Sequence, residues 1–330
     1  MQFIQNIQQR LIGNVLYKFS LIFCSLYVVL FYGNVNGKNI LLYLLLSMIV
    51  CIGIGGIGYV LNDIVDYDAD LKNKKRNLFI KASKMQSTLF VITFIVFAIF
   101  PWFYLPFTTV TVCFLIIEYI LFFLYSFPPF RLKEKGILGI LADALYAQVI
   151  PNLLAVYTFL KLSETLKLHY TFIILFSVWL LLVGIRNILK HQIEDYENDI
   201  NTNTNTFVTK NGKLLSEKIS YFLANIEIII FCVLLFLLKT PMHFILILYV
   251  VYVILLLFSK KINKNPITLF DFINSRILNE FYEIHLPVSL LIYFSFVQHF
   301  FILILLFNIV LFYPIYKSFL VGFYHKYFYH

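Results

Sequence analysis

Charged residues are scarce in this chain: they make up 13% of its 330 residues, whereas hydrophobic residues make up 61%. Soluble domains contain about 25% charged residues. The shortage excludes an ordinary soluble globular protein. The composition therefore predicts an integral membrane protein, and nothing in it indicates a nucleic-acid partner.

Cysteine is also scarce. The four residues Cys24, Cys51, Cys113 and Cys232 are scattered through apolar segments, without a Cys-x-x-Cys pair. Cysteine-based metal and disulfide sites need closely spaced or matched residues. We therefore interpret these four as small core hydrophobes. A small-residue cleavage site is lacking after the first apolar run, so we expect the first helix to be retained.

Long apolar runs are abundant. A helix needs roughly 17 to 25 apolar residues to span a bilayer, and such segments recur along the whole chain. We expect an all-α, polytopic membrane bundle of about nine transmembrane helices, forming one domain over residues 1–330. The last run is long enough to hide a break, so eight or ten spans are alternatives. The expected spans are 12–32, 39–61, 87–105, 108–126, 137–160, 170–189, 219–238, 242–258 and 287–313.

Lysine and arginine indicate the orientation of this bundle. With the N-terminus inside, 18 of the 26 Lys and Arg residues fall on the inner side and six on the outer side. By the positive-inside rule, the N-terminus and the long polar loops are predicted to face the cytoplasm. The net charge of +9 is therefore interpreted mainly as a topology signal.

A first acidic cluster follows the second apolar run, with the sequence Asn-Asp-Ile-Val-Asp-Tyr-Asp-Ala-Asp from Asn62 to Asp70. On a helix, Asp63, Asp66 and Asp70 lie on one face, whereas Asp68 points away. Three carboxylates on one stripe repel each other, more strongly at the edge of an apolar medium. Mg²⁺ removes that repulsion and is commonly held by carboxylates together with substrate phosphates. We predict a metal site here, with Asn62 as a further ligand or orienting group.

A second acidic cluster extends from His191 to Asp199, on another predicted cytoplasmic loop. Asp195 and Asp199 are four residues apart, so both would project from one side if the sixth span continues through them. They could hold a second metal ion. A solvated acidic helix end is the alternative for each cluster alone. Two acidic faces on one side of the membrane favour a single shared site.

A basic loop lies between the two clusters, with the sequence Tyr-Ser-Phe-Pro-Pro-Phe-Arg-Leu-Lys from Tyr125 to Lys133. The paired prolines are expected to stop the fourth span and to fix the chain direction. Arg131 and Lys133 would then meet the oxygen atoms of a diphosphate, which Arg binds as a fork and Lys as a point charge. Ordinary juxtamembrane basic residues are the alternative.

These three motifs, in this order, resemble the UbiA-type intramembrane prenyltransferases. The run Asn62 to Asp70 matches that family's Asn-Asp-x-x-Asp-x-x-x-Asp motif, and Tyr125 to Lys133 matches its Tyr-Ser-x-Pro-Pro-x-Arg-Leu-Lys loop. Asp195 to Asp199 matches its second motif, Asp-x-x-x-Asp. Thr206 and Gly212 fall where the family commonly has a Thr and a Gly.

The chain also departs from the family pattern. Many members have Arg-Pro-Leu after the first motif, whereas Asn77 stands at the proline position here. Asn203 replaces a glycine often found after the second motif, inside an Asn-Thr alternation from Asn201 to Thr206. We interpret this alternation as a flexible loop that closes over the site.

The resemblance implies Mg²⁺-dependent transfer of a prenyl group from a prenyl diphosphate to a small aromatic or lipid acceptor. Asp63, Asp66 and Asp70 would bind one Mg²⁺ ion and Asp195 with Asp199 a second. Loss of the diphosphate would leave an allylic carbocation. The candidate substrate-binding residues are Asn62, Tyr125, Arg131, Lys133, Lys190 and Arg186. For Arg186, a structural ion pair is the alternative role.

Aromatic and polar residues near the motifs complete the candidates. The π face of an aromatic ring attracts a carbocation, although packing is the alternative role for each ring. Polar residues inside spans are expected to face the bundle interior. The aromatic candidates are Tyr67, Tyr125, Tyr146 and Tyr196, and the polar residues are Asn14, Lys18, Asp143 and Gln148.

Two other functions remain open. Capture of the cation by the prenyl chain's own double bonds would make the protein a terpene cyclase of the same superfamily, and the motifs do not separate the two reactions. An ion-coupled transporter is less favoured. Transporters tend to place coupling charges near the bilayer midplane in repeated halves, whereas these acids cluster at one predicted membrane face.

Overall fold

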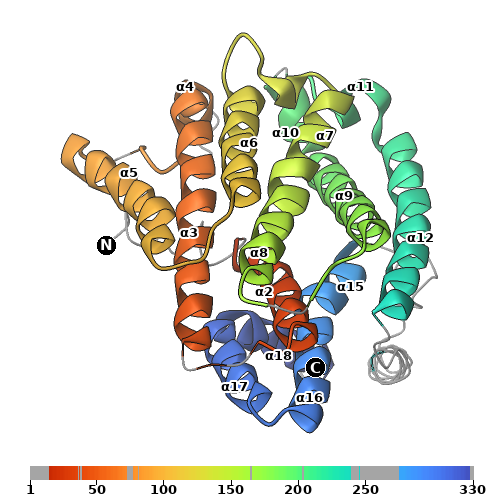
Figure 1. Ribbon diagram of the computed structural model, residues 1–330. Coiled ribbons are helices and arrows are strands. Elements are labelled where there is room, and N and C mark those ends of the chain that lie inside the picture. The colour runs from red at the N-terminus through yellow and green to blue at the C-terminus, as the bar shows by residue number, and fades with distance from the viewer. Residues whose placement is uncertain are drawn as a thin grey trace.

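A computed structural model describes residues 15–35, 37, 39–72, 77–80, 82–163, 166–202, 204–238, 245 and 275–327. All regular secondary structure in these residues is helical, which confirms the all-α class. The helices form a bundle (Figure 1). The short helices α4 (Tyr67–Lys72) and α10 (Tyr196–Asn201), which carry parts of the two acidic motifs, lie at the same end of it. We call this the acidic end.

The long helices follow the apolar runs, and two of them, α5 (Lys84–Ile99) and α6 (Thr109–Ser126), begin with a capping box. Ser83 and Gln86 form the capping box at the start of α5, and Thr108 and Thr111 form the one at the start of α6. Such caps satisfy backbone N–H groups that have no helical partner. In chain order the helices are α2 (Val15–Tyr32), α3 (Ile40–Val65), α5 (Lys84–Ile99), α6 (Thr109–Ser126), α7 (Ile137–Ala144), α8 (Ile150–Leu160), α9 (Tyr170–Glu194), α11 (Phe207–Asn211), α12 (Lys213–Leu237), α15 (Ser275–Glu280), α16 (Leu286–Val297), α17 (Phe301–Leu311) and α18 (Tyr313–Tyr327).

Six of the described helices are long and apolar enough to cross a membrane, or seven if the pair α17 and α18, bent by 66°, counts as one span. This is the architecture of a multi-pass membrane protein, but the expected count of nine is not confirmed. The expected span 242–258 lies outside the described residues. The expected span 287–313 contains a break, because the backbone turns out of the helix at Gln298 (φ −134°, ψ 106°) before α17 begins.

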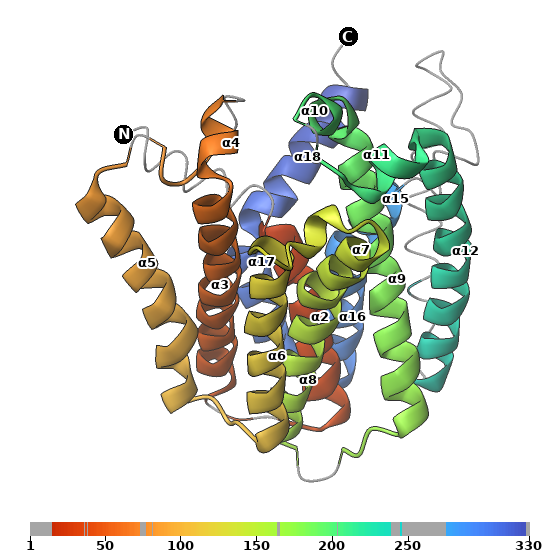
Figure 2. The same ribbon diagram turned by 90° about the horizontal axis from the view of Figure 1, so that it is seen from above.

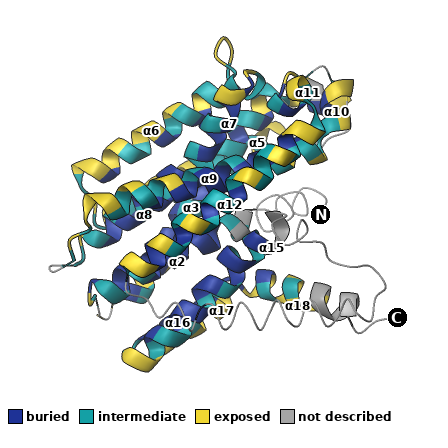
Figure 3. Ribbon diagram, turned by 90° about the vertical axis from the view of Figure 1, so that its right-hand side faces the viewer, coloured by how far each residue is buried: buried dark blue, intermediate teal, exposed yellow. Residues whose placement is uncertain are grey.

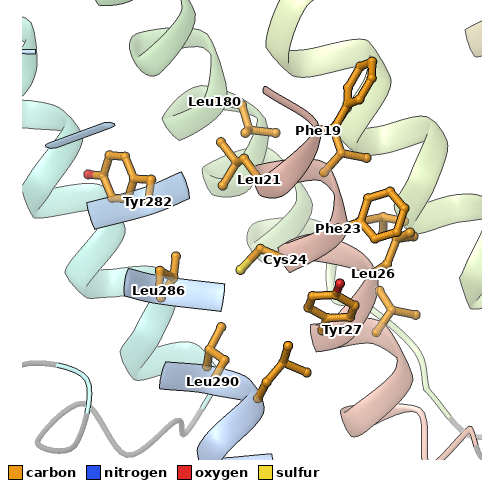
Figure 4. Close-up of a cluster of buried hydrophobic side chains, with 14 of the residues drawn as sticks. Phe19, Leu21, Phe23, Cys24, Leu26, Tyr27, Leu180, Tyr282, Leu286 and Leu290 are labelled. Atoms are coloured by element: carbon orange, nitrogen blue, oxygen red, sulfur yellow. The ribbon is translucent and has the colours of Figure 1, made fainter. Parts of the chain in front are cut away.

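The packed core surrounds α2. Phe23, Leu26 and Tyr27 on this helix are fully buried. Figure 4 shows Leu21 and Cys24 of α2 on the side of Leu180, Tyr282 and Leu286, which come from other helices. Lipid tails are as apolar as leucine, so membrane helices associate through close packing and hydrogen bonds rather than through burial from water. The hydroxyl of Tyr27 accordingly donates to Asn308 Oδ1 at 2.9 Å, across 281 residues of sequence.

The helices at the edge of the bundle expose apolar side chains (Figure 3). In the span Lys84–Phe103 only 17% of the most apolar window is buried, against 61% in Ile137–Leu160. Close contact nevertheless joins α5 to α3: a Cβ atom at Gly53 would lie 2.3 Å from the backbone nitrogen of Ala98. Seen from above, α3, α6, α8 and α9 stand around the middle of the bundle (Figure 2).

Candidate active site

One cavity connects the two acidic motifs with the interior of the bundle. Its volume is about 500 Å³, within the range of roughly 300 to 1,000 Å³ that small-molecule sites occupy. At the acidic end its wall contains Asp66, Asp70, Asp195 and Asp199. Further along the helices, the wall is formed largely by apolar and aromatic side chains. Such a cavity suits a molecule with an anionic head and a hydrocarbon body. The apolar and aromatic part includes Leu26, Ile54, Leu105, Phe122, Tyr146 and Leu154.

The two acidic motifs share one local backbone geometry. Asp66 separates α3 from α4 with φ −91° and ψ 5°, and Asp195 separates α9 from α10 with φ −88° and ψ 2°. The helical hydrogen bonds continue past each bend, from Asp70 N to Asp66 O at 2.8 Å and from Asp199 N to Asp195 O at 2.9 Å. Each motif therefore keeps its last two aspartates one turn apart, on the wall of the cavity.

Asp63 lies outside this wall. Its side chain is fully buried, and its Oδ2 accepts a hydrogen bond from the backbone N–H of Leu78 at 2.7 Å. The segment that follows α4 thus folds back onto α3 and is held there by Asp63. The structure brings four of the five predicted carboxylates to the cavity. Metal ligation by Asp63 stays a prediction.

Asn77 fixes the same segment to the first motif. Its Nδ2 donates to the Asp63 carbonyl oxygen at 2.7 Å and to Asp70 Oδ2 at 2.9 Å, and only 3% of the residue is exposed. A proline at this position has no side-chain donor. The departure from the family pattern therefore orients one of the cavity carboxylates. The sequence marked the position, but it did not reveal this role.

The paired prolines end α6 as predicted. The helix stops at Ser126, Phe127 is extended, and Pro128 and Pro129 follow. Arg131 then adopts the left-handed conformation (φ 36°, ψ 57°), which is uncommon for a residue other than glycine. This residue directly precedes the short 3₁₀ helix η2 (Leu132–Glu134), which carries Lys133.

Arg131 and Lys133 both bind Asp66. Arg131 Nη2 lies 3.1 Å from Asp66 Oδ1, Lys133 pairs with Asp66 Oδ2, and Lys133 Nζ also donates to Asn62 Oδ1 at 3.1 Å. Burial lowers the pKa of the Lys133 ammonium, while the charge of Asp66 acts in the opposite direction. The predicted anion-binding residues are thus at the cavity, next to the predicted metal ligands.

The donor chemistry of this wall fits a hard cation such as Mg²⁺, which prefers carboxylate and amide oxygens. Within the described part of the chain, however, no three Asp, Glu, His or Cys side chains converge as a ready-made metal site. Both carboxylate oxygens of Asp66 already contact Arg131 or Lys133. A metal ion at Asp66 would therefore compete with these two cations for the carboxylate.

The second motif has fewer basic neighbours at the cavity. His191 Nδ1 lies 3.7 Å from Asp195 Oδ2, and both residues line the cavity. Lys190 instead faces Glu194, at 3.7 Å, and is not part of the cavity wall. Substrate binding by Lys190 therefore stays a prediction without geometric support.

The Asn-Thr alternation forms part of the wall beside Asp199. Thr202, Thr204 and Thr206 all line the cavity, so the alternation supplies a hydroxyl-bearing residue at every second position. Thr204 N donates to the Asp199 carbonyl oxygen at 2.8 Å, and Thr206 caps α11 by accepting from Thr209 N at 3.3 Å. The expected position of this loop at the site is supported.

Two of the four candidate tyrosines reach the cavity. Tyr125 and Tyr146 line it, with their rings 5.1 Å apart in an edge-to-face arrangement, and the hydroxyl of Tyr146 donates to Asp143. Tyr67 is 37% exposed and lies outside the wall. Tyr196 contacts Lys213 Nζ, 4.7 Å from its ring centroid, rather than the cavity.

Arg186 forms a buried ion pair. Its Nε and Nη2 donate to Glu227 Oε2 and Oε1 at 2.8 and 3.0 Å, and both side chains are fully buried. Arg186 does not line the cavity. The geometry favours the structural ion pair over the predicted substrate-binding role, because both carboxylate oxygens of Glu227 are bound by the guanidinium.

Sequence reasoning missed Glu118 and Trp102, both of which line the cavity. Glu118 stands alone in the apolar run 108–126, and an ionisable residue inside a membrane span is by default a functional candidate. That signal was available in the sequence. Lys18 also lines the cavity, as expected for an intramembrane polar residue, whereas Asn14 lies outside the described residues.

Comparison with known proteins gives both a family and a fold. No curated protein sequence matches the chain. A UbiA homolog from Archaeoglobus fulgidus, bound to GPP and Mg²⁺, is similar in structure, with a TM-score of 0.54 and 16% identity over 86% of this chain and 98% of that one. Digeranylgeranylglyceryl phosphate synthase has a TM-score of 0.57 and 16% identity, over 88% and 99%. At such identities these structures show the fold alone. The model of the UbiA prenyltransferase family matches residues 20–273, and the chain therefore belongs to this family.

Proposed function

We propose that the protein transfers a prenyl group from a prenyl diphosphate to a small aromatic or lipid acceptor, in a Mg²⁺-dependent reaction. The observation that carries the proposal is one cavity whose wall joins Arg131, Lys133 and two aspartates from each motif to an apolar interior. These aspartates are Asp66, Asp70, Asp195 and Asp199. Homologues from Archaeoglobus fulgidus bind GPP or DMAPP together with Mg²⁺, which supports this choice of substrate. By the distribution of basic residues, the acidic end would face the cytoplasm.

Asp66 and Asp70 would hold one Mg²⁺ ion and Asp195 and Asp199 another, with Asp63 as a further ligand of the first. When bound, Mg²⁺ neutralises the diphosphate and stabilises it as a leaving group. Both oxygen atoms of Asp66 are paired with cations, so diphosphate binding would provide Arg131 and Lys133 with new anionic partners and release Asp66 to the metal.

The remaining steps need a dry and electron-rich cavity. Tyr125 and Tyr146 present aromatic rings to the cavity beside the acidic end, and such rings stabilise a carbocation without the reactivity of water. The apolar wall excludes water from the cation. The acceptor then forms the new bond to the allylic carbon and loses a proton.

Cyclisation of the prenyl chain is the second candidate, because the same cavity would contain a cation without any acceptor. Product analysis separates the two. The purified protein is incubated with Mg²⁺ and prenyl diphosphates of different lengths, alone and with phenolic or lipid acceptors. We expect a prenylated acceptor. A cyclic hydrocarbon or alcohol formed without an acceptor would contradict transfer and support cyclisation.

Removal of the Asn77 side chain should lower the affinity of the site for Mg²⁺. In Asn77→Ala, Asp70 loses the donor at 2.9 Å that orients its carboxylate, and loss of such an orienting hydrogen bond typically costs about 10- to 100-fold in metal affinity. We expect the Mg²⁺ concentration for half-maximal diphosphate release to rise at least about tenfold. Mg²⁺ titration of the reaction measures this.

Asn225→Ala is the matched control for Asn77→Ala. Asn225 lies on α12 and donates to the Tyr221 carbonyl oxygen at 2.8 Å within its own helix. The Asn225→Ala substitution should leave the Mg²⁺ concentration for half-maximal diphosphate release unchanged. An unchanged requirement in a folded Asn77→Ala protein would show that Asp70 does not need this hydrogen bond.

A further inference from the structure

Glu118 is a buried carboxylic acid on the cavity wall. It lies on α6 and is 1% exposed. Its Oε2 atom has no hydrogen-bond partner among the described residues, although the residue lines the cavity. Burial of a carboxyl group without a hydrogen-bond partner is costly. Such a group in a ligand cavity points to a ligand that supplies the missing partner.

The same bundle shows what a structural carboxylate looks like in this protein. Glu227 is also fully buried, but the Arg186 guanidinium binds both of its oxygens at 2.8 and 3.0 Å. No ion pair of this kind reaches Glu118 from the residues that the structure describes. Lys18 lies on the same cavity wall and interacts with Glu118 electrostatically. The positive charge of Lys18 lowers the free-energy cost of a carboxylate at Glu118, but Lys18 forms no hydrogen bond with Oε2.

Glu118 stands well below the acidic end. It precedes Tyr125 by seven residues on α6, a rise of about 10 Å along a helix at 1.5 Å per residue. The diphosphate site and Glu118 therefore mark two different depths of one cavity. Trp102 contributes a second unsatisfied group to the same wall, since its buried Nε1 also lacks a partner within the described part of the chain.

We propose that Glu118 binds the hydroxyl group of the acceptor. This inference rests on the proposed function and specifies its second substrate: a hydroxyl-bearing molecule, such as a phenol or an alcohol, whose O–H hydrogen bonds to the Glu118 carboxyl group deep in the cavity. The body of the acceptor then extends toward Tyr125 and Tyr146, where the prenyl cation is generated.

The chemistry of the wall selects a hydroxyl over other groups. A hydrocarbon tail would leave Glu118 without a partner. A carboxylate on the ligand has no donor to offer Glu118 and would bring a further charge into the apolar part of the cavity. A hydroxyl group donates to an ionised carboxylate or accepts from a protonated one, and its oxygen also suits the Trp102 indole N–H, which is only a donor.

Binding of 2-naphthol, compared with naphthalene, tests the proposal. The two probes differ by one hydroxyl group, and equilibrium dialysis of the full-length protein in detergent measures both affinities. A buried hydrogen-bonding group left unsatisfied is equivalent to about tenfold in affinity. We expect wild-type protein to prefer 2-naphthol by at least about tenfold, and Glu118→Leu to lose that preference with little change for naphthalene.

Thr158→Val is the matched control. Thr158 lines the same cavity, but its hydroxyl already donates to the Leu154 carbonyl oxygen at 2.7 Å, so its removal should leave the preference for 2-naphthol intact. If Glu118→Leu does not fold, Glu118→Met replaces it with the same expected result. Wild-type protein that binds both probes equally, or a folded Glu118 variant that keeps the preference, would overturn the proposal.

The outcome is independent of the proposed function, because dialysis uses neither Mg²⁺ nor a prenyl diphosphate. Loss of the preference in Glu118→Leu, with diphosphate release in wild type, supports both. If the protein releases diphosphate but binds 2-naphthol and naphthalene equally well, only the proposed acceptor site at Glu118 is rejected. If the protein releases no diphosphate from any prenyl diphosphate, the proposed prenyltransferase function is rejected, whichever probe the protein binds.

Discussion

Asp66→Asn and Asp195→Asn are each expected to lower diphosphate release by about 100- to 1,000-fold, the usual cost of losing one group that stabilises developing charge. Asp66 and Asp195 occupy the two helix bends at the acidic end and line one cavity. The substitution keeps the shape of each side chain and removes its negative charge, so metal and diphosphate binding should fail without a large change in packing. Release of inorganic diphosphate from a prenyl diphosphate and Mg²⁺ measures the effect.

Asp68→Asn is the matched control for both variants. Asp68 lies in the same acidic run, but it is exposed and points away from the cavity. Its replacement removes one negative charge from the same end of the bundle and should leave release near the wild-type rate. Near-normal release in a folded Asp66→Asn or Asp195→Asn protein would mean that the two motifs do not form a diphosphate site.

Arg186→Met is expected to produce the largest loss of stability. It leaves Glu227 as an uncompensated buried carboxylate, and breaking a buried ion pair in this way costs about 3 to 5 kcal/mol in the free energy of unfolding. The double variant Arg186→Met/Glu227→Leu should recover most of that loss, because it removes both charges. Unfolding of the detergent-solubilised protein, followed by denaturant titration, measures both.

The same pair of variants tests the alternative role of Arg186. If the guanidinium acted mainly on substrate, Arg186→Met would keep the wild-type free energy of unfolding and lose diphosphate release, and the double variant would not differ from it in stability. A stable single variant would therefore contradict the structural ion pair.

The long helices were predictable because an apolar run in the sequence extends over most of each of them. The stop after Ser126 was predictable from Pro128 and Pro129, since proline disfavours helical backbone in the residue before it. The number of spans was not, because polar residues such as Gln298 end a helix inside an otherwise apolar run. Hydropathy averages over such a local turn.

The pairing of the aspartates on the cavity wall was predictable from their spacing within each motif. Helical periodicity placed Asp66 with Asp70 and Asp195 with Asp199, and the structure brings all four to one cavity. Periodicity also placed Asp63 on that face. In the structure Asp63 accepts a hydrogen bond from the backbone N–H of Leu78, and such a contact between distant residues has no signature in helical spacing. Metal ligation by Asp63 stays a prediction.

Long-range contacts also explain the partners and roles that the sequence did not reveal. Arg186 and Glu227 are 41 residues apart on α9 and α12, and only the packing of these two helices makes them partners. Asn77 became informative as a departure from a family pattern, but its bond to Asp70 depends on the segment that folds back onto α3. Glu118 was visible as a lone acid in an apolar run, whereas its position on the cavity wall required the fold.

The most direct test of the central claim is diphosphate release by the wild-type protein in Mg²⁺ and in excess chelator. We expect the purified protein to release diphosphate from a prenyl diphosphate such as GPP when Mg²⁺ is present, and chelation to stop the release reversibly. Full release in excess chelator, or no release from prenyl diphosphates of any length, would contradict a metal-dependent diphosphate site at the acidic end.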